Sequence, residues 1–444
     1  MLERRFGGGG GGAYLGMRIL RERRYVTGPL LAHPLAWSRQ LIRIIQSTDK
    51  PSCILMPCNA TAEFGESSHS RKTATRLLLL AVAATSFFPA CATRVTDEAN
   101  GPAPSGPALS EFFRLGDEAA GDTILFGGIG ELVAVDGAGR IFVGEQQDPR
   151  IYAFTADGDL FGTIGRQGSG PGEFERIGSI YTGPGDTLYV FDSRLERMSA
   201  YEPNGLELAY DFTVSQDSLG LPYRLVGVLD TGFLMTFGLP VTPDDVMPDG
   251  RLYLMRVDWT GQVMPPPVHD LPASEWLASR DADFRFVLRM PFGRNPVFRL
   301  GSGGSLYSGW TESVDIAVTM PDGAQSSAVT HTLASIPLTR QEIERYIESL
   351  PALFRSHIVK ADLPATKPAY ETFVVDDRRR VWIKATPPST ADSTAQWLVF
   401  GADGGLHGQL SLPVTVNLRV IRGDRAYAED RGDVTTLVVY RIQD

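Results

Sequence analysis

Apolar and polar residues alternate with a period of two through much of the chain after residue 130. The stretch 131–165, ELVAVDGAGRIFVGEQQDPRIYAFTADGDLFGTIG, contains four short alternating segments separated by Gly- and Asp-containing turns. Such alternation predicts half-buried β-strands, and Gly or Asp-Gly between two alternating runs predicts hairpin turns. This stretch is therefore predicted to form four consecutive antiparallel strands.

The same unit recurs along the rest of the chain. Segments like its second strand begin at Arg140, Thr187, Gly232, Ser305, Arg380 and Arg425. Segments like its third strand begin at Arg150, Arg197, Leu252, Val314, Gln396 and Thr436. A core spacing of about 45 residues is typical of a four-stranded propeller blade. We therefore predict an all-β protein, a six-bladed β-propeller.

The last repeat contains only three strands before the chain stops at Asp444. An unfinished blade would leave an open sheet edge, so residues 110–128 are predicted to supply the fourth strand and close the ring. Two insertions interrupt the repeats, at 270–296 and 338–368. The second insertion has apolar residues at helical spacing after Thr339, which predicts a short helix capped by that residue.

The region before the repeats divides into three parts. Residues 71–91 have basic residues, then the apolar run LLLLAVAA, then small residues, as in a secretory signal peptide. The apolar run is shorter than the roughly 20 residues that a membrane-spanning helix needs. Residues 1–70 are interpreted as a leader, either disordered or a start-site over-extension with Met56 as one candidate start. Residues 92–109 are rich in Ala, Pro, Gly and Ser and are predicted to form a flexible tether to the propeller at 110–444.

The signal segment ends in Phe88-Pro89-Ala90-Cys91, which resembles the lipobox of bacterial lipoproteins. The resemblance implies that Cys91 becomes the mature N-terminus and carries the lipid anchor. Two or more acyl chains hold a protein on a membrane, so we predict a lipid-anchored location at the cell envelope. The alternative is an ordinary signal peptide in which Cys91 is incidental.

Charge and cysteine content exclude several functions. Residues 1–90 carry a net charge of +7 and the whole chain −10, which leaves −17 for the remainder. An acidic body of this kind is unsuited to nucleic acid, which binds mainly through Lys and Arg. No cysteine follows Cys91, which excludes thiol catalysis and cysteine-ligated zinc in the repeats. Cys53 and Cys58 lack further ligands at metal-binding spacing.

One face of the predicted ring collects charged loop residues. The loops that join second to third strands, and those that join successive blades, lie on the same face of a propeller, and the insertions are expected over that face. The candidate ligand-binding residues are Glu145, Asp192, Arg194, Trp310, Glu312, Lys384 and Glu429. A concave site of this kind is the default ligand site. The alternative is that these side chains are simply solvated surface.

An enzyme is the second hypothesis, because some propellers hold a catalytic metal on their axis. The predicted innermost strands offer Glu131, Arg224, Arg299, Glu371, Asn417 and Arg419. This set is too basic for a calcium site, and the histidines are scattered. The sequence also lacks a G-x-S-x-G motif. We therefore expect no metal and no cofactor, and we identify no catalytic residue.

The segments GRIFV, RIYAFTADGDLFGTIGRQGSGPGEF and LYVFDSRLERMSAYEPNG resemble the NHL-like six-bladed β-propeller lipoproteins of environmental bacteria. The resemblance covers residues 110–444 and implies the fold and an exported location. Members of this group mostly lack an assigned activity. We therefore predict an exported, lipid-anchored propeller that binds a peptide, a carbohydrate or a partner protein. The alternative is a metal-dependent, lactonase-like hydrolase or lyase.

Overall fold

The computed structural model describes residues 16–21, 24–29, 106–117, 124–216, 219–238, 250–278, 287–355, 358 and 363–443. These residues all belong to one compact unit. The predicted signal peptide with Cys91, and the predicted tether as far as residue 105, lie outside the described residues. Within the predicted leader, β1 (Gly16–Arg21) and β2 (Arg24–Pro29) pair as an antiparallel hairpin.

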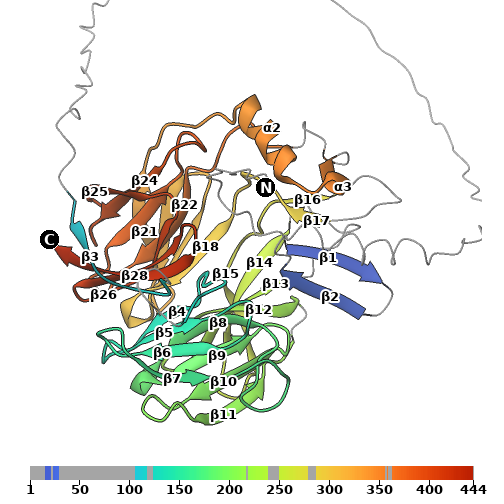
Figure 1. Cartoon of the computed structure of the whole chain (residues 1–444), viewed down its shortest axis with the longest axis vertical. Coiled ribbons are helices and arrows are strands. Elements are labelled where there is room, and N and C mark those ends of the chain that lie inside the picture. Colours follow the sequence, from blue (N-terminus) through green and yellow to red (C-terminus); the bar gives the residue numbers. More distant parts are fainter. Residues whose placement is uncertain are drawn as a thin grey trace, which may run out of the picture. The chain divides into compact units, whose positions relative to one another are not determined.

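Six four-stranded antiparallel sheets form the blades of a β-propeller (Figure 1). Blades 1 and 2 consist of β4 (Val133–Val135), β5 (Ile141–Gly144), β6 (Ile151–Phe154), β7 (Leu160–Ile164), β8 (Ile177–Thr182), β9 (Leu188–Asp192), β10 (Arg197–Tyr201) and β11 (Leu208–Thr213). Blades 3 and 4 consist of β12 (Leu221–Leu229), β13 (Gly232–Gly238), β14 (Arg251–Val257), β15 (Val263–Pro272), β18 (Pro296–Leu300), β19 (Leu306–Trp310), β20 (Val314–Thr319) and β21 (Gln325–His331). Blades 5 and 6 consist of β22 (Tyr370–Val375), β23 (Val381–Ala385), β24 (Thr394–Phe400), β25 (Leu406–Pro413), β26 (Val416–Arg422), β27 (Arg425–Arg431), β28 (Thr435–Gln443) and β3 (Ala108–Leu115).

The first strand of each blade contacts the first strand of the next. The contacts run from β4 through β8, β12, β18 and β22 to β26, and β26 contacts β4 again. These six strands therefore form a closed inner ring. The predicted six-bladed propeller is confirmed.

The ring closes through a strand from the other end of the chain. β3 pairs antiparallel with β28, with Leu115 opposite Leu437 and Ala108 opposite Gln443 (Figure 1). Phe126 forms a further bridge to Thr435. The predicted closure by residues 110–128 is thus confirmed, and it gives the last blade the fourth strand that its own repeat lacks.

An aspartate organises the first turn of blades 1 and 5. Asp136 Oδ1 accepts hydrogen bonds from the backbone N–H groups of Ala138 and Arg140, and its Oδ2 accepts one from Arg140 Nε at 2.5 Å. Asp376 and Arg380 repeat the contact at 2.6 Å. Aspartate is favoured in turns because its carboxylate replaces missing backbone partners. The same Asp and Arg residues therefore stabilise the same hairpin geometry in both blades.

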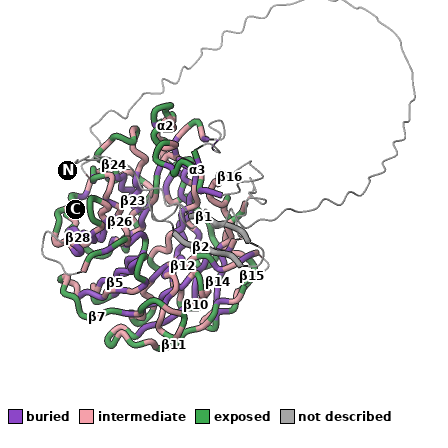
Figure 2. The backbone as a smooth tube through the Cα atoms, turned by 45° about the vertical axis from the view of Figure 1, so that its right-hand side comes forward, coloured by how far each residue is buried: buried purple, intermediate pink, exposed green. Residues whose placement is uncertain are grey.

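The hydrophobic core lies between blades. Each interface between neighbouring blades has its own cluster of buried residues, such as Phe142 and Val190 between blades 1 and 2. Figure 2 shows the buried residues inside the molecule and exposed ones on outer strands such as β7 and β11. The blades are thus stabilised by packing face to face, which buries apolar area that one blade alone could not cover.

The two insertions pack on each other. The first contains the hairpin β16 (Trp276–Ala278) and β17 (Val287–Arg289), and the second contains α2 (Arg340–Ser349) and α3 (Ala352–Arg355). Leu277 and Leu288 of the hairpin share a buried cluster with Leu350 and Phe354. Thr339 caps α2 through a capping box with Glu342, as predicted.

In the described part of the chain, no helix has the length and apolar character to cross a membrane.

Candidate functional site

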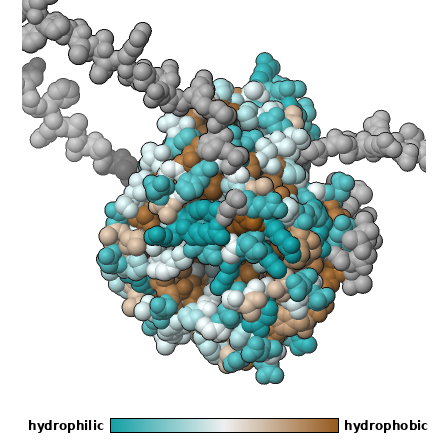
Figure 3. Space-filling view, turned by 90° about the vertical axis from the view of Figure 1, so that its left-hand side faces the viewer, coloured by the Kyte–Doolittle hydropathy of each residue, from teal (hydrophilic) through white to brown (hydrophobic). Residues whose placement is uncertain are grey.

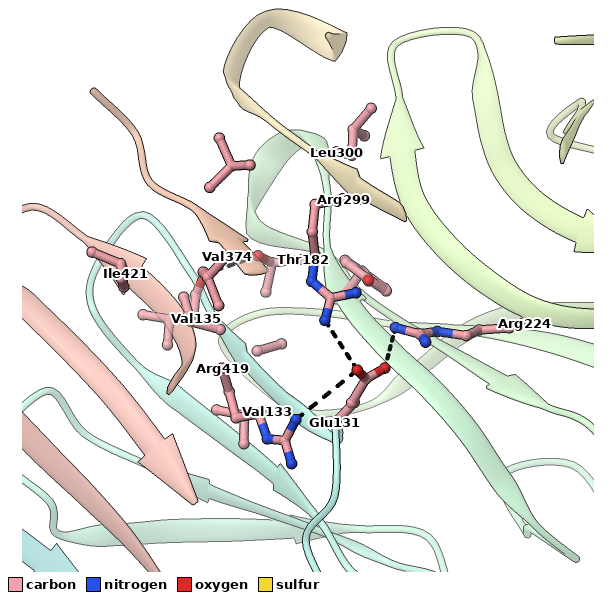
Figure 4. A pocket seen from close by; sticks show the side chains of 14 residues that line it. Glu131, Val133, Val135, Thr182, Arg224, Arg299, Leu300, Val374, Arg419 and Ile421 are labelled. Carbon is pink, nitrogen blue, oxygen red and sulfur yellow. Dashed lines mark hydrogen bonds and ion pairs between the residues drawn. The ribbon is translucent and has the colours of Figure 1, made fainter. Parts of the chain in front are cut away.

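The inner strands of all six blades line a cavity of about 170 Å³ on the propeller axis (Figure 4). Its polar wall residues are Glu131, Tyr181, Thr182, Arg224, Arg299 and Arg419. Its remaining wall residues are aliphatic: Val133, Ala134, Val135, Leu300, Val374, Val375, Val420 and Ile421. The cavity therefore combines charged groups with apolar surface, as ligand sites commonly do.

Three arginines from three blades converge on one glutamate in this cavity (Figure 4). Arg299 Nη2 lies 3.0 Å from Glu131 Oε1, and Arg419 Nη1 lies 3.9 Å from the same oxygen. Arg224 Nη2 forms an ion pair with Glu131 Oε2. The Glu131 side chain is still 39% exposed, so the cluster is open to solvent inside the ring.

The arginines keep the central carboxyl ionised. Burial alone would raise the pKa of the Glu131 carboxyl, but Arg224, Arg299 and Arg419 hold it far below its usual value. One carboxylate faces three guanidinium groups, so the cluster retains positive charge in excess of what Glu131 neutralises. A positive cavity inside an acidic body focuses its field on the axis.

β-Bulges direct several of these side chains. The pairing of inner strand β26 with β27 skips Arg419, and the pairing of β22 with β23 skips Glu371. The pairing of β12 with β13 skips Tyr223, directly before Arg224. A bulge adds one residue to a strand and re-aims side chains, often beside a site. Neighbouring residues that would otherwise alternate can therefore both face the axis.

The first insertion carries a further arginine, which does not line the cavity. Arg289, the last residue of β17, donates from Nη2 to Ser274 Oγ at 3.0 Å. Burial and the nearby charge of Arg224 lower the pKa of the Arg289 guanidinium, whereas Tyr223 and Glu131 act in the opposite direction. Arg289 therefore lies within electrostatic reach of the axial site. Among the described residues it has no carboxylate partner at ion-pair distance.

Two of the carboxylates predicted to bind a ligand accept hydrogen bonds from the backbone. Glu145 accepts from the N–H groups of Gly127 and Gln147, both at 2.8 Å. Asp192 is buried and accepts from four backbone N–H groups, at residues 175, 176, 194 and 195. These contacts secure the loops at the blade ends. A ligand-binding role for either residue stays a prediction.

Two other predicted residues lie close to the axial cluster. Glu429 is fully buried, pairs with Arg419 and accepts from the N–H of Gly130 at 2.8 Å. Lys384 is also buried and reaches Glu371 at 3.0 Å and Asn417 at 2.9 Å. Burial lowers the pKa of Lys384, while Glu371 opposes that effect. The structure thus connects Glu429 directly to the arginines.

The remaining predicted residues lie at the blade ends. Arg194 forms an ion pair with Glu175 at 2.7 Å, and both side chains are substantially exposed. Trp310 ends β19, and Glu312 is exposed in the loop that follows it. No described contact joins these three residues to the axial arginines, and their ligand-binding role stays a prediction.

Sequence reasoning placed Glu131, Arg224, Arg299 and Arg419 on the innermost strands but weighed them only as calcium ligands. The useful signal was the concentration of arginine at similar positions of several inner strands. Tyr181 and Thr182 also line the cavity and were not singled out. No local pattern marks them, because uncharged polar residues occur throughout the strands.

With an inner ring of six blades and a charged axial cavity, the protein is defined as a six-bladed β-propeller with an arginine-lined axial site. Residues 119–217 match the DUF5128 family, described as a 6-bladed beta-propeller. No curated protein matches the chain.

Solved structures of low identity are similar to this chain. A predicted exported protein of Bacteroides fragilis is 11% identical, with a TM-score of 0.45 over 78% of this chain and 98% of that one. A DUF4221 member from Bacteroides vulgatus is 12% identical, with a TM-score of 0.44 over 76% and 98%. Virginiamycin B lyase from Staphylococcus aureus is 8% identical, with a TM-score of 0.36 over 71% and 83%. No functional conclusion follows from likenesses this distant.

Proposed function

We propose that this propeller is a binding module whose ligand carries an anionic group that docks in the axial cavity. The observation that carries the proposal is the convergence of Arg224, Arg299 and Arg419 on a single carboxylate in a solvent-accessible cavity. Arginine presents a planar fork of N–H donors that matches carboxylate and phosphate oxygens. Guanidinium groups gathered beyond the number that Glu131 neutralises favour a negatively charged guest.

The proposed setting is the cell envelope. It is supported by the signal-peptide pattern of residues 71–91 and by the lipobox-like sequence that ends at Cys91. In this setting the protein is an exported, lipid-anchored module that presents its axial cavity to a small molecule or to an acidic group of a peptide, carbohydrate or protein.

The alternative, a metal-dependent propeller hydrolase or lyase, is not favoured by a specific observation. Among the described residues, no group of three or more His, Cys, Asp or Glu side chains is arranged to hold a metal ion.

Anion binding to the full-length protein tests the proposal. Titration calorimetry with acetate, sulfate and inorganic phosphate at constant ionic strength should show saturable binding of at least one anion. Arg299→Gln should weaken that binding about tenfold, because a hydrogen bond to a charged group contributes about 1.5–3 kcal/mol. Arg251→Gln is the matched control and should bind normally, because it removes an exposed arginine of β14 that pairs with Asp270 of β15. Equal binding by both variants would contradict the proposal.

A further inference from the structure

The wall of the axial cavity is divided by polarity. The three arginines gather at Glu131, whereas Val135, Val374 and Ile421 lie together on the side away from Arg224 (Figure 4). Eight of the fourteen wall residues are aliphatic, so the wall outside the arginine cluster is mainly apolar. A guest that fills this cavity therefore has one charged end and an apolar body.

The arginine cluster contains a hydrogen-bond donor that is not used. The side chain of Arg419 lines the cavity and is only 10% exposed. Its Nη1 faces Glu131 and its Nη2 pairs with Glu429. Its Nε is buried and has no hydrogen-bond partner among the residues that the structure describes. A buried donor without an acceptor is unfavourable, so the cluster favours one further acceptor oxygen from a guest.

The two hydroxyl groups of the wall already have partners within the protein. Thr182 Oγ1 donates to the Val135 carbonyl at 3.0 Å. The Tyr181 hydroxyl accepts a hydrogen bond from the Arg224 guanidinium. A hydroxylated guest would bury its own hydroxyl groups against the aliphatic residues, which is unfavourable unless each finds a partner. The wall therefore favours a guest whose body carries no hydroxyl groups.

The polarity of the wall also distinguishes a carboxylate from a phosphate. The cluster already accommodates one carboxylate, because Glu131 presents one oxygen to Arg299 and Arg419 and the other to Arg224. The charge of an organic carboxylate lies at one end of the molecule, where its oxygens match the guanidinium fork. Inorganic phosphate is charged on all sides and would lose water at the aliphatic side without replacement. The division therefore favours a carboxylate.

The size of the cavity limits the length of the guest. Its volume of about 170 Å³ is close to that of the engineered cavity of about 150 Å³ that holds benzene, a molecule of six carbon atoms. An aliphatic carboxylate of about four or five carbons has about six or seven non-hydrogen atoms and fits a space of this size.

We infer that the anionic guest of the axial site is a short aliphatic carboxylate, whose charged end binds the arginine cluster and whose alkyl chain packs on the aliphatic wall. The inference rests on the proposed function, because it names the ligand class of the same site. Arg419 donates to the guest carboxylate from Nε, and Leu300 contributes to the surface that contacts the alkyl chain.

Calorimetry of the full-length protein with acetate, propionate, butyrate and pentanoate tests the inference. Affinity should rise about fourfold with each added methylene as far as butyrate, which is the gain expected for burying one CH₂ group. Inorganic phosphate, 1-butanol and 3-hydroxybutyrate should each bind at least about tenfold more weakly than butyrate. They lack the alkyl chain, lack the charge or add a hydroxyl group, respectively.

Variants separate the two ends of the cavity. Leu300→Ser should weaken butyrate binding about tenfold and change acetate binding less than about twofold, because only butyrate reaches the aliphatic wall. Leu160→Ser removes an exposed leucine from outer strand β7 and is the matched control, with binding expected to be unchanged. Arg419→Lys keeps the positive charge but has no donor at the position of Nε, so it should weaken acetate and butyrate alike, about tenfold.

The possible outcomes separate the two proposals. Equal affinities for acetate, butyrate and pentanoate would overturn the inference and leave the anion-binding module in place. Phosphate or 3-hydroxybutyrate binding as tightly as butyrate would do the same, as would unchanged butyrate binding by a Leu300→Ser protein that keeps its fold by circular dichroism. If Leu300→Ser does not fold, the series of chain lengths with the unmodified protein decides. If no carboxylate, sulfate or phosphate binds, the proposed function itself fails.

Discussion

Glu131 and Glu342 are both held ionised by cationic side chains, but their surroundings differ. Glu131 lies in a cavity that solvent reaches, and its three arginine partners come from different blades. Glu342 is buried in α2, 2.6 Å from Lys367, and accepts from the N–H groups of Thr339 and Thr390. The accessible cluster can exchange partners with a guest, whereas the buried pair fixes the insertion to blade 5.

The Glu342–Lys367 pair predicts a stability that depends on pH. Burial acts to raise the pKa of Glu342, but Lys367 and the backbone donors lower it from 4.5 to about 2. Because the folded-state pKa is depressed, this contribution is present above pH 4.5 and is lost as the pH falls towards 2. Glu342→Gln should destabilise the protein by about 3 kcal/mol at pH 7, because it leaves a buried lysine without its charge partner.

Urea denaturation of the unmodified protein and Glu342→Gln across this pH range measures the effect. The difference in free energy of unfolding should shrink between pH 4.5 and 2. Arg340→Ala on the same helix breaks an exposed pair with Glu344 and should change stability by less than about 1 kcal/mol. A Glu342→Gln difference that is constant with pH would show that the pair does not govern this stability.

At the scale of elements, the short inner strands position the side chains that line the axial cavity. The inner strands carry bulges at Tyr223, Glu371 and Arg419, and Arg419 lines the axial cavity. The outer strands are more exposed and make fewer buried contacts. Closure of the ring depends on β3, because blade 6 otherwise ends at β28.

Removal of the closing strand should destabilise the ring. A chain that starts at Thr96 loses only tether residues relative to the predicted mature chain that begins at Cys91, and it should melt like that mature chain. A chain that starts at Ile129 lacks β3 and Phe126, so β28 keeps an unpaired edge and its backbone hydrogen bonds to β3 are lost. It should aggregate or melt at a clearly lower temperature in a thermal scan. Equal melting temperatures would show that β3 contributes nothing to the ring.

At the scale of the whole molecule, charge is unevenly distributed. The acidic remainder of the chain surrounds an axial cavity whose wall is rich in arginine. Figure 3 shows one face on which hydrophilic residues gather near the middle and hydrophobic residues are scattered among them.

Lipid anchoring predicts where the protein partitions in a bacterial host. The mature protein should begin at Cys91 and sediment with membranes, because acyl chains on that residue would retain it there. Cys91→Ser should move the protein to the soluble fraction, and deletion of residues 1–55 should leave export unchanged. An unchanged membrane fraction for Cys91→Ser would exclude the anchor.

The sequence by itself determined the repeat, the six blades and the closure by the segment before the first repeat. It also placed the cap at Thr339 and the charged residues on the inner strands. These features follow from local patterns: alternation with a period of two, turn residues at fixed spacing and helical spacing after a capping residue. Counting the strands of each repeat was enough to show that the last repeat lacks its fourth strand.

Only the tertiary structure decided which charged side chains meet. Glu131 and Arg299 are far apart in the chain and come together because the inner strands form a ring. Bulges at Tyr223 and Arg419 break the alternation that assigns side chains to a face, so their direction cannot be read from spacing. The two insertions likewise pack on each other through apolar contacts between segments distant in the sequence. The chemistry of the site is therefore set by long-range packing, which local patterns do not specify.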